Sequence, residues 1–164
     1  MVRWSSLLNQ GVIILHQKKD NVIIKKRKIP TNENYLAYNG AHCHYLWNHI
    51  PESWRCPGCG RSKFEIMRWT KRFVKNGVRC KPYKDWIAIL HGHHDHAINS
   101  RFDEVVVCDQ CNIADAVVKR ELKLNRNFSF SPSEIKQFIK ATPHGRHRID
   151  YVKAREIYER VNSR

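Results

Sequence analysis

The chain has 164 residues, a length typical of one domain with at most a small appendage. It carries 30 lysine and arginine residues against 15 aspartate and glutamate residues, which gives a formal net charge of +15. A polyanion would relieve the self-repulsion of such a charge, so nucleic acid is the expected partner and an anionic membrane surface the weaker alternative. No apolar stretch approaches the roughly 18–20 residues of a membrane span, and no signal segment is recognisable, so we expect a cytoplasmic protein without a membrane partner.

The N-terminal region is basic and is predicted to contain a β-hairpin. Across residues 11–28, two apolar stretches flank a polar turn, and the second stretch ends in four consecutive cations. These cations are Lys25, Lys26, Arg27 and Lys28. Such residues protect an exposed edge strand from aggregation, and they equally suit an arm that contacts phosphates, so both interpretations stay open.

The centre of the chain predicts a second hairpin, followed by two strands and a helix. Residues 64–81 are basic with interleaved aromatic side chains, and Asn76 followed by glycine is a strong hairpin-turn signal. Short apolar runs predict strands over residues 86–96 and 104–108. Apolar residues at helical spacing predict a helix over residues 112–123.

Two further helices are predicted in the C-terminal part. Ser131 followed by proline is a helix start, and this helix runs to about residue 141. The last helix covers residues 149–161, with Val152 and Ile157 among its apolar positions. The apolar stripe of these helices suits either core packing or a dimer interface, so a homodimer stays open.

The order of these elements predicts an α+β fold with three regions. Residues 1–53 form a basic, β-rich region that we expect to contact DNA. Residues 54–125 form a small ββα core stapled by zinc, because a motif this small gains from a structural metal. Residues 126–164 form a helical region for DNA contacts or dimerisation.

Two Cys-x-x-Cys pairs bracket the central region, and their members are Cys56, Cys59, Cys108 and Cys111. Two intervening residues let both thiolates of a tight turn face one ion, and two such pairs complete a tetrahedral zinc site. In a reducing compartment, paired cysteines bind metal more often than they bind each other. The isolated Cys43 and Cys80 are expected to be buried thiols.

A histidine-rich stretch, His91-Gly-His-His-Asp-His-Ala97, lies between the two cysteine pairs. Asp95 and His96 are adjacent at the end of a predicted strand, where neighbouring side chains point to opposite faces, so one can bind metal while the other addresses water. Asn112 begins the next helix, from which its side chain can return to the same ion. Oxygens of Asp and Asn are hard ligands that suit Mg²⁺ or Mn²⁺. A metal ion, a base and basic side chains are the requirements for phosphodiester hydrolysis.

This ordered combination resembles the HNH nucleases, also called ββα-metal nucleases. The resemblance covers residues 54 to about 123 and is closest to the zinc-bound branch that includes phage endonuclease VII and HNH restriction enzymes. It implies structural zinc on the four paired cysteines, a catalytic Mg²⁺ or Mn²⁺ on Asp95 and Asn112, and His96 as the general base. The implied activity is metal-dependent endonuclease cleavage of double-stranded DNA, with a sequence-specific restriction enzyme as one expectation.

Two features of the chain depart from the family pattern. Many members have an asparagine between the two strands that orients the base, and Asn99 is the candidate for this role. The run of histidines also permits a second register, in which His93 and His94 replace Asp95 and His96, as in members that use a histidine ligand. In the first register, His94 lies on the same strand face as His96 and can contact phosphate or assist the metal.

Basic residues from three parts of the chain are expected to contact nucleic-acid phosphates, with an affinity that falls steeply with salt. They are Lys25, Lys26, Arg27, Lys28, Arg68, Lys71, Arg72, Arg79, Arg146 and Arg148. A non-catalytic zinc module that binds DNA or RNA is the alternative from a different class. A nuclease directed at RNA is a third, because the chemistry acts on the phosphate and does not separate DNA from RNA.

Overall fold

The structure, a computed structural model, describes residues 28–72 and 83–163. The hairpin expected over residues 11–28 and the turn expected at Asn76 therefore lie outside the described residues. The same holds for Lys25, Lys26, Arg27, Arg79 and Cys80.

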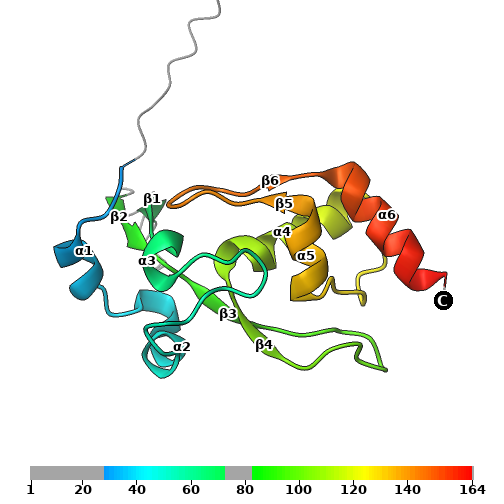
Figure 1. Ribbon diagram of the computed structural model, residues 1–164, viewed down its shortest axis with the longest axis horizontal. Helices are drawn as coiled ribbons and strands as arrows, with labels where there is room; N and C mark the ends of the chain where they lie inside the picture. Colours follow the sequence, from blue (N-terminus) through cyan, green and yellow to red (C-terminus); the bar gives the residue numbers. More distant parts are fainter. Residues whose placement is uncertain (1–27, 73–82, 164) are drawn as a thin grey trace, which may run out of the picture.

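The described part has the predicted α+β class, with short helices around three separate two-stranded sheets (Figure 1). Its helices are α1 (Asn32–Leu36), a 3-10 turn (Ala41–Cys43), α2 (His44–His49), α3 (Lys63–Ile66), α4 (Asp109–Glu121), α5 (Pro132–Phe138) and α6 (Tyr151–Asn162). Its strands are β1 (Arg68–Arg72), β2 (Tyr83–Ile87), β3 (Leu90–His93), β4 (Val105–Cys108), β5 (Ile139–Lys140) and β6 (Arg148–Ile149). All three sheets are antiparallel. No helix in the described ranges is long and apolar enough to cross a membrane.

The strand predicted over residues 86–96 is wrong as a single element, because the chain changes sheets within it. β2 pairs with β1, whereas β3 pairs with β4. Between them, the backbone groups of Ala88 bond to the Tyr38 hydroxyl, which donates to the Ala88 carbonyl at 3.2 Å and accepts from its N–H at 3.0 Å. β3 ends at His93, because the Asp95 carboxylate accepts the N–H groups of Ala97 and Arg101 and turns the chain.

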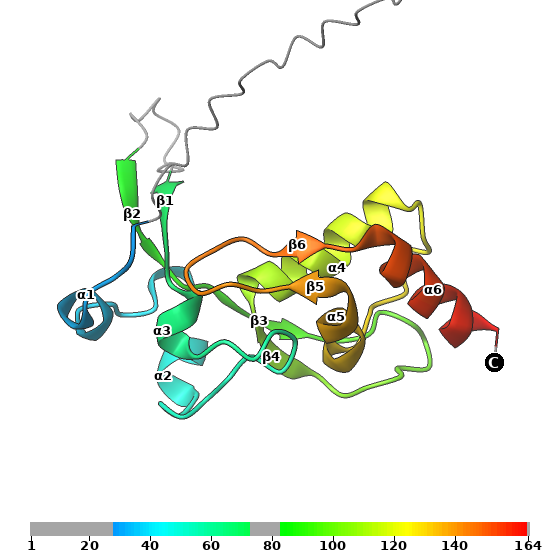
Figure 2. The ribbon, with the colours of Figure 1, turned by 45° about the horizontal axis from the view of Figure 1, so that its top comes forward.

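The two strands and the helix of the predicted core are adjacent in space. In the β3–β4 pair, Leu90 lies opposite Cys108 and His93 opposite Val105. β4 leads without a loop into α4, which begins at Asp109, earlier than the predicted Asn112. Figure 2 shows α4 running away from the sheet, with the β3–β4 connection extending on the other side of α5.

The C-terminal helices share one hydrophobic core with this ββα element. Phe130, Ile135 and Phe138 pack with Val118 of α4, and Ile157 of α6 is fully buried in the same cluster. Ser131 caps α5 as predicted, accepting the N–H of Glu134. The prediction for Val152 is wrong, because it lies on the outer face of α6 with 72% of its surface exposed. Core packing therefore accounts for the buried stripe, and a dimer stays a prediction.

Candidate functional site

The two cysteine pairs converge on one point, as the spacing predicts. The Sγ atoms of Cys56, Cys59, Cys108 and Cys111 all lie within 4.8 Å of one another, and three of the four residues are fully buried. Contacts of 3.6 Å join Cys56 to Cys111, and contacts of 3.7 Å join Cys108 to Cys59 and to Cys111. A tetrahedron with zinc–sulfur bonds of about 2.3 Å has edges of about 3.8 Å, so the cluster can hold a metal ion such as zinc.

The first cysteine pair lies in a tight turn that two glycines make possible. Gly60 has φ +73°, a left-handed conformation, and its N–H bonds to the Cys56 carbonyl at 2.6 Å. Gly58 has a different role, because a Cβ atom there would lie 2.9 Å from Cys111 Sγ. One glycine therefore bends the chain, and the other lets the second cysteine pair approach it.

Two basic residues that were not expected at the cysteine cluster contact the sulfurs. Arg61, only 4% exposed, donates from Nε to Cys59 Sγ and from Nη2 to Cys108 Sγ, both at 3.4 Å. His147 Nε2 lies 3.4 Å from Cys111 Sγ. Burial lowers the pKa of His147, but hydrogen bonds to the Cys108 and Cys59 sulfurs outweigh burial and the pKa is raised. The Arg61 guanidinium offsets part of the negative charge that four thiolates bring to one ion.

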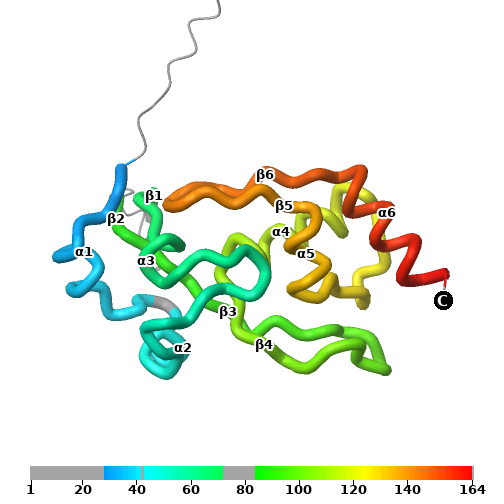
Figure 3. Tube along the Cα trace, in the orientation of Figure 1, coloured from blue at the N-terminus to red at the C-terminus, as the bar shows by residue number. Residues whose placement is uncertain are grey.

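Arg61 also ties the cysteine cluster to a distant loop. Its Nη1 donates to the carbonyl oxygens of Thr142 and Gly145, at 3.3 and 3.0 Å. These residues belong to the β5–β6 connection, which extends back to the end of the molecule that holds β1 (Figure 3). No spacing in the sequence marks this contact, because its partners are backbone carbonyls more than 80 residues away.

The four thiols share protons unevenly when no ion is bound. Hydrogen bonding with Cys108 lowers the pKa of Cys59 and raises that of Cys56 and Cys111, and hydrogen bonding with Cys111 lowers the pKa of Cys108. Four sulfurs this close cannot all ionise without a cation. Metal binding therefore displaces the protons that keep part of the cluster neutral.

A second set of polar groups lies where β3 meets the first turn of α4. His93 Nε2 lies 2.8 Å from the Phe130 carbonyl, an acceptor only, so Nε2 donates to it, and in the neutral ring Nδ1 keeps its lone pair. That Nδ1 faces Asn112 Oδ1 at 3.3 Å. The contact is favourable when Nδ1 carries a proton, when the Asn112 amide turns so that Nδ2 donates, or when a cation lies between the two side chains. A histidine whose other nitrogen donates to a carbonyl has the usual arrangement of a metal ligand.

Two more histidines border this point and are open to solvent. The rings of His94 and His96 are in edge-to-face contact, with centroids 4.5 Å apart, and both residues are exposed. His94 Nδ1 lies 3.6 Å from Glu104 Oε2. Gly92 makes room for this carboxylate, since a Cβ atom there would lie 2.5 Å from Glu104 Oε1. Glu104 therefore lies beside His94, and the role expected of Asn99 in orienting the base stays a prediction.

Asp95, the first choice for a metal ligand, lies in a different environment. Its side chain is 0% exposed and pairs with Arg101 at 3.3 Å. It also accepts the N–H groups of Ala97, Arg101 and Ser129 at 3.2–3.3 Å. Arg101 in turn pairs with Glu134 of α5 and stacks over the Phe128 ring. These contacts occupy the carboxylate with protein donors, so it holds the β3–β4 connection against α5.

His91 also faces a protein partner. Its Nε2 lies 3.5 Å from Asp109, which pairs with Arg68 at 2.8 Å. Burial raises the pKa of Asp109, but its hydrogen bond with His91 and the charge of Arg68 outweigh burial and hold that pKa below its usual range. This network joins β1, β3 and the start of α4.

The predicted nucleic-acid contacts that fall on described residues gather near β1. Arg68, Lys71 and Arg146 line one hollow beside α4, and Arg68, Arg146 and Arg148 line a second that adjoins it. Lys28 lies over the Trp69 ring at 3.5 Å, close to the same hollows. Arg72 belongs to β1. Side chains that are about 80 positions apart in the sequence therefore share one surface.

Comparison with known proteins gives no relative for this chain. No protein-family model matches the sequence, and neither a curated protein nor a solved structure was found to match it.

Proposed function

We propose that the protein is a metal-dependent endonuclease of the ββα-metal type. The observation that carries the proposal is the approach of His93 Nδ1 to Asn112 Oδ1 at the junction of β3 and α4. The four-cysteine cluster lies at the other end of the same strands and fixes how β4 enters α4, which suits a structural zinc. Thiolate ligands also suit the reducing cytoplasm that we expect for this chain.

Of the two registers that the sequence permits, the geometry favours the second. Both Asp95 and His93 are buried, but Asp95 is paired with Arg101, whereas His93 Nδ1 faces Asn112. We therefore assign His93 and Asn112 as the ligands of the catalytic ion and His94 as the general base. An imidazole ligand favours a transition metal over Mg²⁺, so Mn²⁺ is the better candidate of the two expected ions.

The residues of the site would divide the work of hydrolysis between them. A divalent cation held by His93 and Asn112 would supply positive charge for the phosphate and the leaving oxygen. His94 is exposed and has Glu104 beside Nδ1, so its ring can hold a proton on Nδ1 and accept one from water at Nε2. His96 lies against the His94 ring and is accessible to a phosphate oxygen. Exposed cations around β1 would contact the flanking backbone.

The test is cleavage of supercoiled plasmid with added Mn²⁺ or Mg²⁺. His94→Ala is expected to lower the rate by about 100- to 10,000-fold, the usual contribution of a general base. His96→Ala is the matched control, because it removes the neighbouring exposed imidazole and is expected to cost much less. A large loss in His96→Ala with full activity in His94→Ala would restore the Asp95–His96 register.

A non-catalytic zinc module that binds nucleic acid is the second candidate, and the basic surface beside the cysteine cluster favours it. It predicts salt-sensitive binding with no metal-dependent turnover on plasmid, branched DNA or RNA. The same assay on RNA also separates a DNA nuclease from an RNA nuclease.

A further inference from the structure

A basic groove lies beside the first turn of α4, on the side away from His93. It consists of two adjoining hollows of about 360 and 630 Å³ that share Arg68, Thr70, Arg146 and His147. β1 supplies one wall, and the β5–β6 connection with β6 supplies the other. The cationic lining comprises Arg68, Lys71, Arg146 and Arg148. Gln110 and Ile113 of α4 close its inner side.

The charge of the basic groove is only partly compensated. Asp109 pairs with Arg68 at 2.8 Å, but no carboxylate lines either hollow, and no ion pair is formed by Lys71, Arg146 or Arg148 within the described part of the chain. Burial lowers the pKa of Arg68, and the like charges of Arg146 and Arg61 add to this effect against the attraction of Asp109. A bound anion relieves the repulsion between like charges that are held close together.

Helical geometry relates this groove to the proposed cleavage site. Successive residues of an α-helix turn by about 100°, so Gln110, which lines the groove, and Asn112, which faces His93, lie on nearly opposite sides of α4. A helix with its side chains is about 10–12 Å across. Two phosphates bound at these places would therefore be separated by about the width of the major groove of B-DNA, roughly 12 Å.

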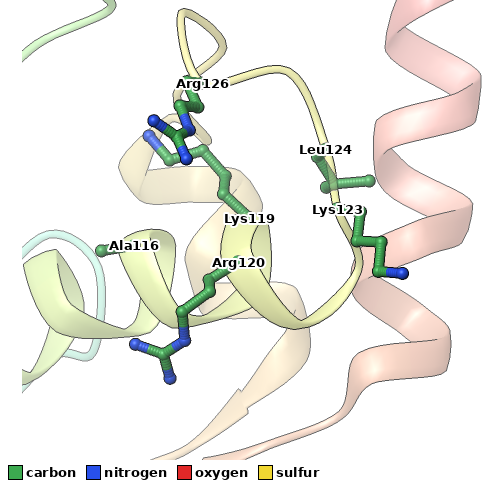
Figure 4. Close-up of a pocket in the computed structure, with 6 residues that line it drawn as sticks. All are labelled: Ala116, Lys119, Arg120, Lys123, Leu124 and Arg126. Carbon is green, nitrogen blue, oxygen red and sulfur yellow. The ribbon is translucent and has the colours of Figure 1, made fainter.

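The face of α4 between these two places is open to solvent. Ile113 and Ala116 are exposed there, and both side chains are short. Beyond them, a pocket at the end of α4 is lined by Ala116, Lys119, Arg120, Lys123, Leu124 and Arg126 (Figure 4). Lys119 there is paired with Asp115 at 2.7 Å, and cations in a last helical turn also complement the helix dipole. The charge of this pocket is therefore partly compensated within the chain itself.

We propose that the basic groove binds the backbone phosphates of one strand of duplex DNA while the other strand lies at the His93–Asn112 site. α4 then enters the major groove with its exposed face. A-form RNA has a deep and narrow major groove that excludes a helix, so the arrangement selects duplex DNA over duplex RNA. The inference rests on the proposed function, because it assumes that the second DNA strand binds at the His93–Asn112 site.

The test measures binding without an added catalytic metal, using zinc-loaded protein and a short fluorescein-labelled DNA duplex. The variant is Arg146→Gln with Arg148→Gln, because both residues are exposed and their loss should leave the fold intact. Each lost phosphate contact lowers the slope of log K against log salt by about 0.9, so the double variant should lose about 2, with a roughly tenfold weaker Kd. Lys153→Gln with Arg160→Gln on α6 is the matched control, because it removes the same charge at the far end of the molecule (Figure 1).

Equal losses in the two double variants would overturn the inference, since total charge alone would then explain them. Duplex RNA bound as tightly as duplex DNA, with the same loss in the groove variant, would also overturn it. The result is separable from cleavage. If no turnover is found but only the groove variant loses duplex binding, the nuclease proposal fails and the groove stands. If cleavage occurs and the groove variant binds like the control, the groove fails and the nuclease stands.

Discussion

The cysteine cluster and the histidine site lie at opposite ends of the same two strands, and they differ in how their donor atoms are satisfied. The four sulfurs are mostly buried, contact one another, and receive hydrogen bonds from Arg61. The histidine site offers His93 and Asn112 at its inner side, while His94 and His96 face solvent. A closed set of four sulfurs suits a structural ion, whereas the histidine site combines the buried His93 with the solvent-exposed His94 and His96. The cysteine cluster can therefore hold a metal ion within the fold, whereas the histidine site is the one that we propose to act in catalysis.

Removing one ligand of the closed site should have the largest effect. Cys108→Ala is expected to abolish cooperative folding, because structural zinc contributes about 10–16 kcal/mol in small zinc-dependent peptides. Circular dichroism and thermal melting, with and without a chelator, measure this loss. Cys43→Ala is the control, since Cys43 is a buried thiol outside the cluster that donates to the Gly40 carbonyl. Equal melting temperatures for the two variants would contradict a structural ion.

Breaking the ion pair between Asp95 and Arg101 should have the next largest effect. Asp95→Asn removes the charge of a fully buried carboxylate that pairs with Arg101, whose side chain is 29% exposed, so about 3 kcal/mol of unfolding free energy, the lower end for a buried pair, is expected. Urea denaturation monitored by tryptophan fluorescence measures it. Glu134→Gln, which loses the second carboxylate on the same arginine, should cost less because the Glu134 side chain is 13% exposed and that of Asp95 is 0% exposed. A stable Asp95→Asn protein with no affinity for Mn²⁺ would instead make Asp95 a ligand.

The proposed ligand itself should affect metal binding more than stability. His93→Ala is expected to weaken Mn²⁺ binding about 10- to 100-fold, because the loss of a ligand should cost at least as much as the loss of its second-shell support. Isothermal titration of zinc-loaded protein with Mn²⁺ gives the affinity. His91→Ala serves as control, since His91 faces Asp109. Unchanged affinity in His93→Ala would remove this residue from the site.

Substitutions at the two glycines of the cysteine turn should have the smallest effect. Gly58→Ala places a Cβ atom 2.9 Å from Cys111 Sγ, so it should weaken zinc binding, with an overpacking cost of about 1–3 kcal/mol. Gly60→Ala meets no atom within 4 Å and should cost only about 1 kcal/mol through its left-handed backbone. Competition with a chromophoric chelator separates the two. Equal zinc affinities would show that the cluster adjusts to the added methyl group.

The same contrast explains what the sequence could predict. Cys-x-x-Cys spacing defines a local turn, so the four sulfurs could be assigned before any fold was known. The histidine run has no such local constraint, because its assignment depends on where β3 ends. That end is set by the Asp95 carboxylate accepting backbone N–H groups as far away as Ser129, which no spacing reveals. Arg61 and His147 could not be placed at the cluster for a related reason, since Arg61 contacts Thr142 and Gly145 and His147 contacts Cys111, all far away in the sequence.

The segment that follows α4 has a consequence for dissecting this chain into smaller working pieces. The Phe130 carbonyl bonds to His93, the Ser129 N–H to Asp95, and the Phe130 N–H to Asp115 of α4. In each of these three contacts, one partner lies beyond residue 125, which is the expected end of the ββα core. A fragment cut there would keep every proposed ligand and lose the groups that set the orientation of His93. The smallest autonomous unit of this site must therefore extend through Phe130 and the helix that buries it.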